Sequence, residues 1–157
     1  MNYTISRMTQ DEYGLLEDFL YEAIFIPKGV LAPPREIISR PELQVYIAGF
    51  GSKKSDIAFA AHCGGKIVGA VWVRIMDDYG HIDEQTPSFA ISLYKHYRGM
   101  GIGTALMRTM LEELKKQGYK QASLAVQKEN YAVKMYKNVG FCICDENDEE
   151  YIMVCRL

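Results

Sequence analysis

Residues 98–104 place a cation beside three glycines at alternate positions, in the order Arg-Gly-Met-Gly-Ile-Gly-Thr. Glycine has no Cβ, so this backbone can bend closely around a ligand. A strand-like run, residues 88–93, precedes the turn, and apolar residues recur at helical spacing from Ile102 to Leu114. The turn would therefore present unpaired N–H groups at a helix N-terminus, where an anion is favoured. We predict a diphosphate-binding turn with Arg98 at its edge; the alternative is a glycine turn that only packs strand against helix.

Two other phosphate-binding motifs do not match this stretch. A P-loop ends in Gly-Lys-Ser/Thr, which does not occur here, and a dinucleotide-binding turn has G-x-G-x-x-G where this chain has G-x-G-x-G. The sequence therefore disfavours a nucleotide hydrolase or a hydride-transferring enzyme.

Length and composition predict one globular domain of 157 residues, with 48% hydrophobic and 24% charged residues. A net charge of -2, with scattered lysines and arginines, argues against a nucleic-acid partner. The chain has neither an apolar run of membrane-spanning length nor a signal-peptide pattern at its start, so we expect a cytoplasmic protein without a membrane partner.

The cysteines indicate a reduced protein without a metal site. They form no C-x-x-C pair, and the three histidines do not stand at metal-ligand spacing from them. They occupy apolar strand-like stretches, where a free thiol behaves as a small hydrophobic group. The four are Cys63, Cys142, Cys144 and Cys155.

Strands and helices alternate around the glycine turn. We expect strands at 3–7, 57–63, 66–76, 88–93 and 122–126, and a final hairpin of 141–144 with 151–157. We expect helices at 9–23, at 35–48 with a break near Pro41, from 102 to a stop at Gly118, and at 130–139. The strand at 66–76 is apolar on both faces and should be central in the sheet. The acidic run 145–150 predicts a solvated turn; the alternative is a surface that attracts a cationic substrate.

This order of elements resembles the GNAT superfamily of acyl-CoA-dependent N-acyltransferases. The segment Arg98-x-x-Gly101-x-Gly103 looks like the family's Q/R-x-x-G-x-G/A diphosphate loop, and residues 130–141 resemble its N-x-x-A-x-x-x-Y-x-x-x-G-F segment. The hairpin at 65–69 is also similar to a family turn. The resemblance covers about residues 56–141, whereas residues 1–55 match only by the order of their elements.

The resemblance implies an α/β (mixed α+β) fold in one domain, residues 1–157. Its central sheet would be mixed but mostly antiparallel, with about seven strands flanked by about four helices, and splayed at the coenzyme A site. Residues 1–55 would shape the acceptor site, residues 56–141 would form the coenzyme A-binding core, and residues 142–157 the C-terminal hairpin. Two positions depart from the family pattern: Lys95 replaces a frequent proline, and no carboxylate lies between Phe89 and Leu93, where many members have a glutamate.

The implied activity is transfer of an acetyl group from acetyl-CoA to a primary amine, by direct attack in a ternary complex. Acetyl-CoA would be the cosubstrate, no metal would be needed, and a homodimer is compatible with the resemblance. The amine could belong to a small molecule, a peptide or a protein. The alternative is a non-catalytic acyl-CoA-binding sensor or scaffold.

The resemblance also assigns residues to coenzyme A. The residues are Ile91, Ser92, Leu93, Arg98, Gly99, Met100, Gly101, Ile102, Gly103, Thr104, Asn130 and Tyr136. The strand would splay around a bulge at Ser92 or Leu93, where a backbone N–H polarises the thioester carbonyl. Asn130 could contact the pantetheine arm, cap the last helix, or do both.

Tyr136 is the candidate acid for the leaving thiolate, because a phenol has a reference pKa of about 10, close to that of a thiol. The alternative is an aromatic side chain that packs on the sheet.

The candidate general bases lie in the loop before strand 88–93. They are His81, Asp83 and Glu84, with Glu84 preferred for its reach, and each could instead be an ordinary exposed loop residue. Tyr79, Phe25, Tyr46 and Trp72 could line the acceptor site, although the core is the preferred place for Trp72.

Overall fold

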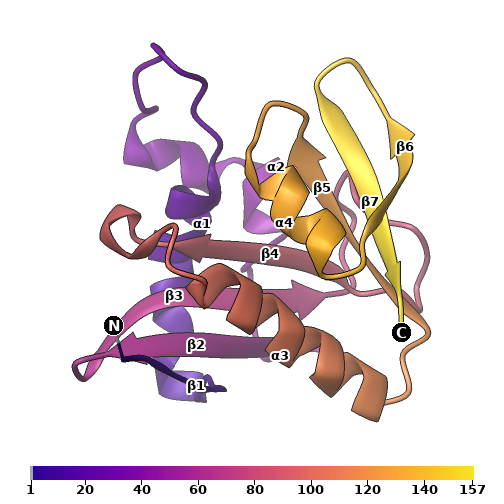
Figure 1. Ribbon diagram of the computed structural model, residues 1–157, viewed down its shortest axis with the longest axis horizontal. Helices are drawn as coiled ribbons and strands as arrows, with labels where there is room; N and C mark the ends of the chain where they lie inside the picture. Colours follow the sequence, from indigo (N-terminus) through magenta and orange to yellow (C-terminus); the bar gives the residue numbers. More distant parts are fainter. Residues whose placement is uncertain (1) are drawn as a thin grey trace.

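Seven strands pair into one sheet, in the order β1-β2-β3-β4-β5-β7-β6, in the computed structural model, which describes residues 2–157 (Figure 1). The strands are β1 Thr4–Arg7, β2 Ile57–Cys63, β3 Lys66–Arg74, β4 Ser88–Leu93, β5 Gln121–Gln127, β6 Cys142–Glu146 and β7 Glu150–Arg156. The α-helices are α1 Leu16–Ala23, α2 Pro41–Gln44, α3 Ile102–Lys116 and α4 Ala132–Asn138. All pairings are antiparallel except β4 with β5, so the predicted fold class is confirmed.

Each face of the sheet buries its own hydrophobic core. Helices α3 and α4 lie in front of the sheet and α1 lies behind it in Figure 1. Alternate residues of a strand point to opposite faces. Accordingly, Val71 and Phe89 pack with Leu106 of α3, whereas Trp72 packs with Phe19 of α1. We call these the α3 face and the α1 face.

Strands β4 and β5 separate almost as soon as they meet. Their one pairing within residues 2–157 is Ser88 with Ser123, supported by a 2.9 Å hydrogen bond from the Ser123 N–H to the Pro87 carbonyl. In Figure 1, β1–β4 run across the view while β5, β7 and β6 turn away from them. The gap in the hydrogen-bond ladder beyond Ser88 is the β4–β5 opening, and it confirms the predicted splay.

Several element boundaries differ from those predicted. The expected helix at 9–23 begins with a 3-10 turn, Gln10–Leu15, before α1, and the expected helix at 35–48 divides into a 3-10 turn, Arg35–Ser39, and the short α2. Strand β3 ends at Arg74 rather than residue 76, because β4 pairs no further and the Ile75 N–H donates instead to the Ser55 hydroxyl. Helix α4 is shorter than predicted, covering 132–138, and β6 extends to residue 146.

The cysteines are all free thiols, but two are not in apolar surroundings as predicted. Cys142 and Cys144 are exposed, because β6 is an edge strand whose five residues are all exposed. Cys155 is buried on β7, and burial raises the pKa of its thiol.

A buried ion pair attaches the segment after α2 to the sheet. The Arg74 guanidinium donates to both Asp56 carboxylate oxygens at 3.0 Å, and both side chains are at most 2% exposed. The same guanidinium donates to the carbonyls of Val45 and Ala48 at 3.1 and 2.9 Å. Because these carbonyls flank Tyr46, the ion pair fixes that tyrosine on the α1 face.

In the described part of the chain, no helix is both long and apolar enough to cross a bilayer.

Candidate active site

The glycine turn leads from β4 into α3, and two of its glycines are required by backbone conformation. Gly99 and Gly101 have φ values of +76° and +85°, and a Cβ added to either would meet no atom within 4 Å. Gly103, by contrast, is packed: its Cβ would lie 3.3 Å from the Met135 sulfur and 3.6 Å from Leu93. Only Gly103 therefore fits the packing alternative, and the surface formed by the other two is open.

The turn leaves backbone donors free at the start of α3. The first hydrogen bond of the helix runs from the Ala105 N–H to the Gly101 carbonyl at 3.2 Å, and no side chain of the described residues caps the helix. Within residues 2–157, the N–H groups of Ile102, Gly103 and Thr104 have no hydrogen-bond acceptor. An open turn with free N–H groups at the positive end of a fifteen-residue helix fits an anionic diphosphate.

Arg98 lies at the edge of the turn, but its guanidinium makes contacts within the protein. Its Nε donates to the Leu93 carbonyl at 2.9 Å, and its Nη2 donates to the Glu22 carbonyl at 3.2 Å and lies 3.3 Å from the Glu22 carboxylate. Arg98 therefore joins the end of β4 to α1. A direct contact between Arg98 and a diphosphate stays a prediction.

The edge of β4 faces the opening without the predicted bulge. The pairing of β3 with β4 runs from Arg74–Ser88 to Gly69–Leu93 with no shift in register, so a bulge at Ser92 or Leu93 is wrong for this pairing. Since the Pro87 carbonyl faces β5, backbone alternation directs the N–H groups of Ile91 and Leu93 toward the opening. Ser92 instead directs its hydroxyl to the Phe19 carbonyl at 2.6 Å on the α1 face. The opening forms because β4 and β5 diverge.

Tyr136 and Asn130 lie on the α3 side of the opening. Tyr136 is 8% exposed and packs edge-on against Phe141, with 6.2 Å between ring centroids. Burial raises the pKa of the Tyr136 phenol above its ordinary value of 10.0, so the phenol keeps its proton at neutral pH. The Asn130 side-chain oxygen accepts a 2.9 Å hydrogen bond from the N–H of Ala132, the first residue of α4, although the N-cap position of the helix is Tyr131. The catalytic role of Tyr136 and the pantetheine contact of Asn130 stay predictions.

The three predicted bases are spread along the β3–β4 loop. Glu84 has a side chain that is 86% exposed and borders a surface pocket with residues 117–120, beyond the C-terminal end of α3. The glycine turn is at the other end of that helix, about 22 Å away for fifteen residues. Asp83 accepts hydrogen bonds from the Thr86 hydroxyl and the Gln85 N–H, both at 2.8 Å, and these lower the pKa of its carboxyl. Within residues 2–157, neither carboxylate forms a hydrogen bond with a residue of β4 or β5.

His81 is less exposed than these two carboxylates. Its backbone N–H donates to the Asp78 carbonyl at 3.1 Å, its Nε2 lies 3.7 Å from the Glu84 carboxylate, and its Nδ1 is buried without a partner in the described residues. The ring therefore shares a turn with Asp78, a residue that the sequence reasoning missed.

Asp78 is a carboxylate at the narrow end of the opening. Its Oδ1 accepts a 3.1 Å hydrogen bond from Ser88, the residue that pairs with β5, and its Oδ2 accepts one of 3.1 Å from the Tyr46 hydroxyl. Burial raises the pKa of the Asp78 carboxyl, against the opposing effects of Ser88, Tyr46 and His81. The sequence signal for this residue is its place in the polar loop before β4; the contact with Tyr46, 32 residues away, is visible only in the fold.

The predicted acceptor-site residues divide between core and rim. Trp72 is fully buried and donates its indole N–H to the Tyr46 carbonyl at 3.0 Å, so it belongs to the core. Tyr46 is partly buried, and its hydroxyl reaches Asp78. Tyr79 is 40% exposed, and Phe25 is half-buried after the end of α1.

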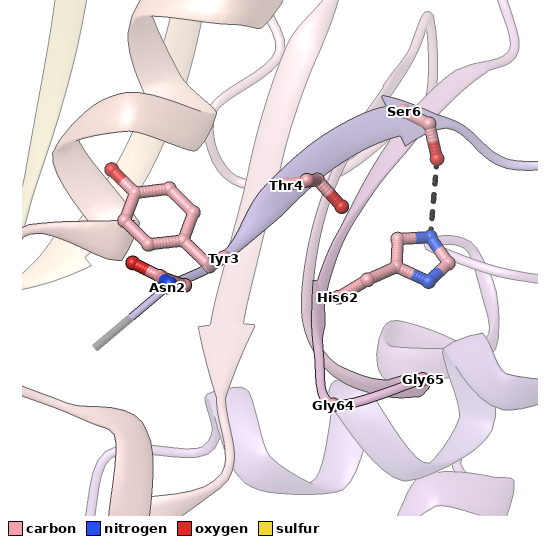
Figure 2. A pocket seen from close by; sticks show the side chains of 7 residues that line it. All are labelled: Asn2, Tyr3, Thr4, Ser6, His62, Gly64 and Gly65. Carbon is pink, nitrogen blue, oxygen red and sulfur yellow. Dashed lines mark hydrogen bonds between the residues drawn. The ribbon is translucent and has the colours of Figure 1, made fainter.

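A surface pocket at the β1 edge is separate from this region. Figure 2 shows Ser6 and His62 beside the Gly64-Gly65 turn, with the Ser6 hydroxyl 3.1 Å from the His62 Nε2. The pocket is bordered by β1 and the β2–β3 hairpin, across β3 from the β4–β5 opening. It therefore contributes nothing to the site around the glycine turn.

Known proteins resemble this chain in both fold and sequence. The chain superimposes on PaiA N-acetyltransferase from Thermoplasma acidophilum, solved with coenzyme A, with a TM-score of 0.73, 17% identity and full coverage of both chains. An acetyltransferase of the GNAT family from Streptococcus pneumoniae gives a TM-score of 0.70 at 20% identity, over 99% of this chain and 100% of that one. At these identities the likeness shows the fold alone.

Sequence relatives match more than half of the chain. N-acetyltransferase 8 of Mus musculus is 34% identical over 53% of this chain and 37% of its own length. Mycothiol acetyltransferase of Corynebacterium glutamicum strain R is 31% identical over 60% of this chain and 31% of its own length. The matched segments thus span about a third of these relatives. The model of the acetyltransferase (GNAT) family matches residues 23–141, and the chain belongs to this family.

Proposed function

We propose that the protein is an acetyl-CoA-dependent N-acetyltransferase that transfers the acetyl group to a primary amine. The observation that carries this proposal is the β4–β5 opening, which has the glycine turn and its free N–H groups at the wide end. The diphosphate of acetyl-CoA would bind residues 99–104, and its pantetheine arm would lie along the free edge of β4. Membership of the GNAT family supports the same cosubstrate.

The residues around the opening meet the requirements of amide formation from a thioester. A fixed N–H of Ile91 or Leu93 can polarise the carbonyl, as a preorganised donor does in acyl transfer. Binding both reactants at one opening replaces a bimolecular encounter with a local one. Tyr136, protonated at neutral pH, can donate its proton to the departing sulfur. We propose direct attack in a ternary complex, a route that needs no covalent intermediate on the protein.

The test is thiol release from acetyl-CoA with a panel of amines, combined with mass spectrometry of the products. We use propane-1,3-diamine, lysine amide and a tripeptide with a free N-terminus as the first acceptors. Thiol release that depends on the amine, with an acetylated product, is the expected result. Tight coenzyme A binding without amine-dependent release would instead identify a non-catalytic acyl-CoA sensor or scaffold.

A further inference from the structure

Asp78 is held in place by three segments of the chain that are far apart in sequence. Its carboxylate accepts hydrogen bonds from Tyr46, which follows α2, and from Ser88, which begins β4. Its own loop is docked on β5, because the Gly80 carbonyl accepts a 2.7 Å hydrogen bond from the Ser123 hydroxyl. A Cβ on Gly80 would lie 3.1 Å from the Ala125 nitrogen, so the loop lies directly against β5.

This arrangement puts a carboxylate on the α1 face, at the point where β4 and β5 part. Ser88 and Trp72 belong to the α1 face, since Ser88 pairs with Arg74, two residues after Trp72. Tyr136 packs into the core of the α3 face. A proton acceptor and a proton donor therefore lie on opposite faces of one opening, as a reaction requires when an amine enters from one face and a thiol leaves on the other.

The Asp78 carboxylate is partly exposed and can take further hydrogen bonds. Its two bonds to hydroxyl groups use two of about four acceptor positions on a carboxylate. The residue retains intermediate solvent exposure, so water and a bound amine can reach it. The titratable groups that face it are Tyr46 from the segment after α2, His81 from its own loop, and Glu150 from β7.

We propose that Asp78 is the general base of the acetyl transfer and that Tyr46 and Ser88 are its positioning residues. The assignment rests on the proposed function. It also accounts for the missing carboxylate in β4, whose residues 89–93 contain no Asp or Glu. The base comes instead from the loop before the strand, and the N-terminal third of the chain supplies the tyrosine that orients it.

The proton balance of the step is as follows. An alkylammonium has a reference pKa near 10.4 and no free lone pair at pH 7, so Asp78 first removes one proton and later releases it to water. The nitrogen lone pair then forms the C–N bond with the thioester carbonyl carbon, the C–S bond breaks, and its electron pair stays on sulfur. Tyr136 protonates the sulfur, and the second proton lost from nitrogen restores the phenol through water. The products are the amide, the free thiol and one solvated proton.

The experiment compares the pH dependence of amine-dependent thiol release for the wild type, Asp78→Asn and Asp77→Asn. Asp77 is the exposed neighbour in the same loop, so Asp77→Asn removes the same charge and serves as the matched control. We expect Asp78→Asn to lower kcat at pH 7 by about 10²- to 10⁴-fold, the range of general acid–base catalysis. Its rate should recover toward pH 10, where the amine loses its proton without help. Coenzyme A affinity should equal that of the wild type.

Tyr46→Phe tests positioning independently of Asp78→Asn. The lost hydroxyl donor stabilised the ionised carboxylate, so its removal raises the pKa of Asp78 further. Since the base must be ionised, the acidic limb of the rate profile should move to higher pH, while coenzyme A affinity stays unchanged.

The outcomes separate the two proposals. A wild type that releases no thiol with any amine overturns the proposed function and this assignment with it. If the wild type transfers acetyl and Asp78→Asn does so at the same rate, the assignment alone is overturned. The same holds if Asp78→Asn is inactive at pH 7 and stays inactive at high pH. If Asp78→Asn fails to bind coenzyme A, Tyr46→Phe decides, and an unmoved acidic limb overturns the assignment.

Discussion

The two faces of the β4–β5 opening are built from different kinds of chemical group. On the α3 side, the free polar groups are backbone N–H groups of one contiguous segment, residues 102–104. On the α1 side, the polar groups are side chains of Tyr46, Asp78 and Ser88, from three separate segments. The first site needs only a turn of the right conformation, whereas the second needs the whole fold to bring its members together. Substitutions should therefore separate cosubstrate binding from proton transfer.

The largest expected effect is on the α1 side, at the ion pair that holds Tyr46. Asp56→Ala leaves Arg74 charged and buried, and we expect the free energy of unfolding to fall by about 3–5 kcal/mol. Urea denaturation followed by circular dichroism measures this loss. Arg35→Ala is the comparison, because it breaks an ion pair with Asp18 in which both partners are exposed, and it should change stability far less. An equal loss in the two variants would contradict the role given to the buried pair.

Tyr136→Phe should lower turnover and leave coenzyme A binding intact, because it removes a proton donor without changing the packed ring. We expect kcat to fall by about ten- to a thousandfold, as for loss of a general acid. Single-turnover acetyl transfer measures the chemical step directly. Tyr131→Phe is the matched control, since that tyrosine is 75% exposed beside the same helix. An unchanged single-turnover rate would assign Tyr136 to packing alone.

The rate of the same reaction should fall on the alkaline side of its pH profile. Burial raises the pKa of the Tyr136 phenol, and the donor must be protonated, so activity should be lost only as pH rises above the ordinary tyrosine pKa of 10.0. A stopped-flow rate profile from about pH 6 to about pH 11, a range that brackets the reference pKa values, measures the alkaline fall in rate. The raised pKa of Tyr136 would be contradicted if the wild-type rate fell at a pH below the ordinary tyrosine pKa and Tyr136→Phe abolished that fall.

The smallest effect is expected at Arg98, whose guanidinium joins β4 to α1. Arg98→Gln should weaken coenzyme A binding by less than about tenfold, the loss of one or two net hydrogen bonds. The salt dependence of the dissociation constant should not change, because the guanidinium neutralises Glu22. Lys95→Gln controls for net charge. A clearly reduced salt dependence in Arg98→Gln alone would show that Arg98 contacts the diphosphate directly.

The contrast between the two faces also explains what the sequence could predict. The glycine turn, the strand before it and the amphipathic helix after it each span fifteen neighbouring positions or fewer, so local patterns predicted them. Asp78 carries no such pattern, because its significance depends on Tyr46 and Ser88, which are 32 and 10 residues away. The preference for Glu84 followed from reach along the loop, and the loop folds so that Glu84 lies at the other end of α3.

Packing also decided the details that differed. The sequence predicts a helix at 35–48 with a break near Pro41, but α2 ends at Gln44. The Arg74 guanidinium binds the carbonyls of Val45 and Ala48, the residues that would have continued the helix. The bulge expected in β4 was inferred from the family resemblance, whereas the opening arises from the divergence of two whole strands. Such features depend on tertiary contacts that no local pattern encodes.

Coenzyme A titration of Gly101→Asp by isothermal calorimetry tests most directly that the glycine turn binds the cosubstrate. Its matched control is Gly118→Asp, at the other end of α3, where φ is +89° against +85° and a Cβ would likewise meet no atom within 4 Å. Both variants bear a similar backbone cost, but only Gly101→Asp places a carboxylate at the free N–H groups. We predict that Gly101→Asp weakens binding by at least about a hundredfold, the equivalent of losing charge-assisted hydrogen bonds of about 3 kcal/mol. Gly118→Asp should bind as the wild type does. A folded Gly101→Asp that binds coenzyme A with wild-type affinity would contradict the account.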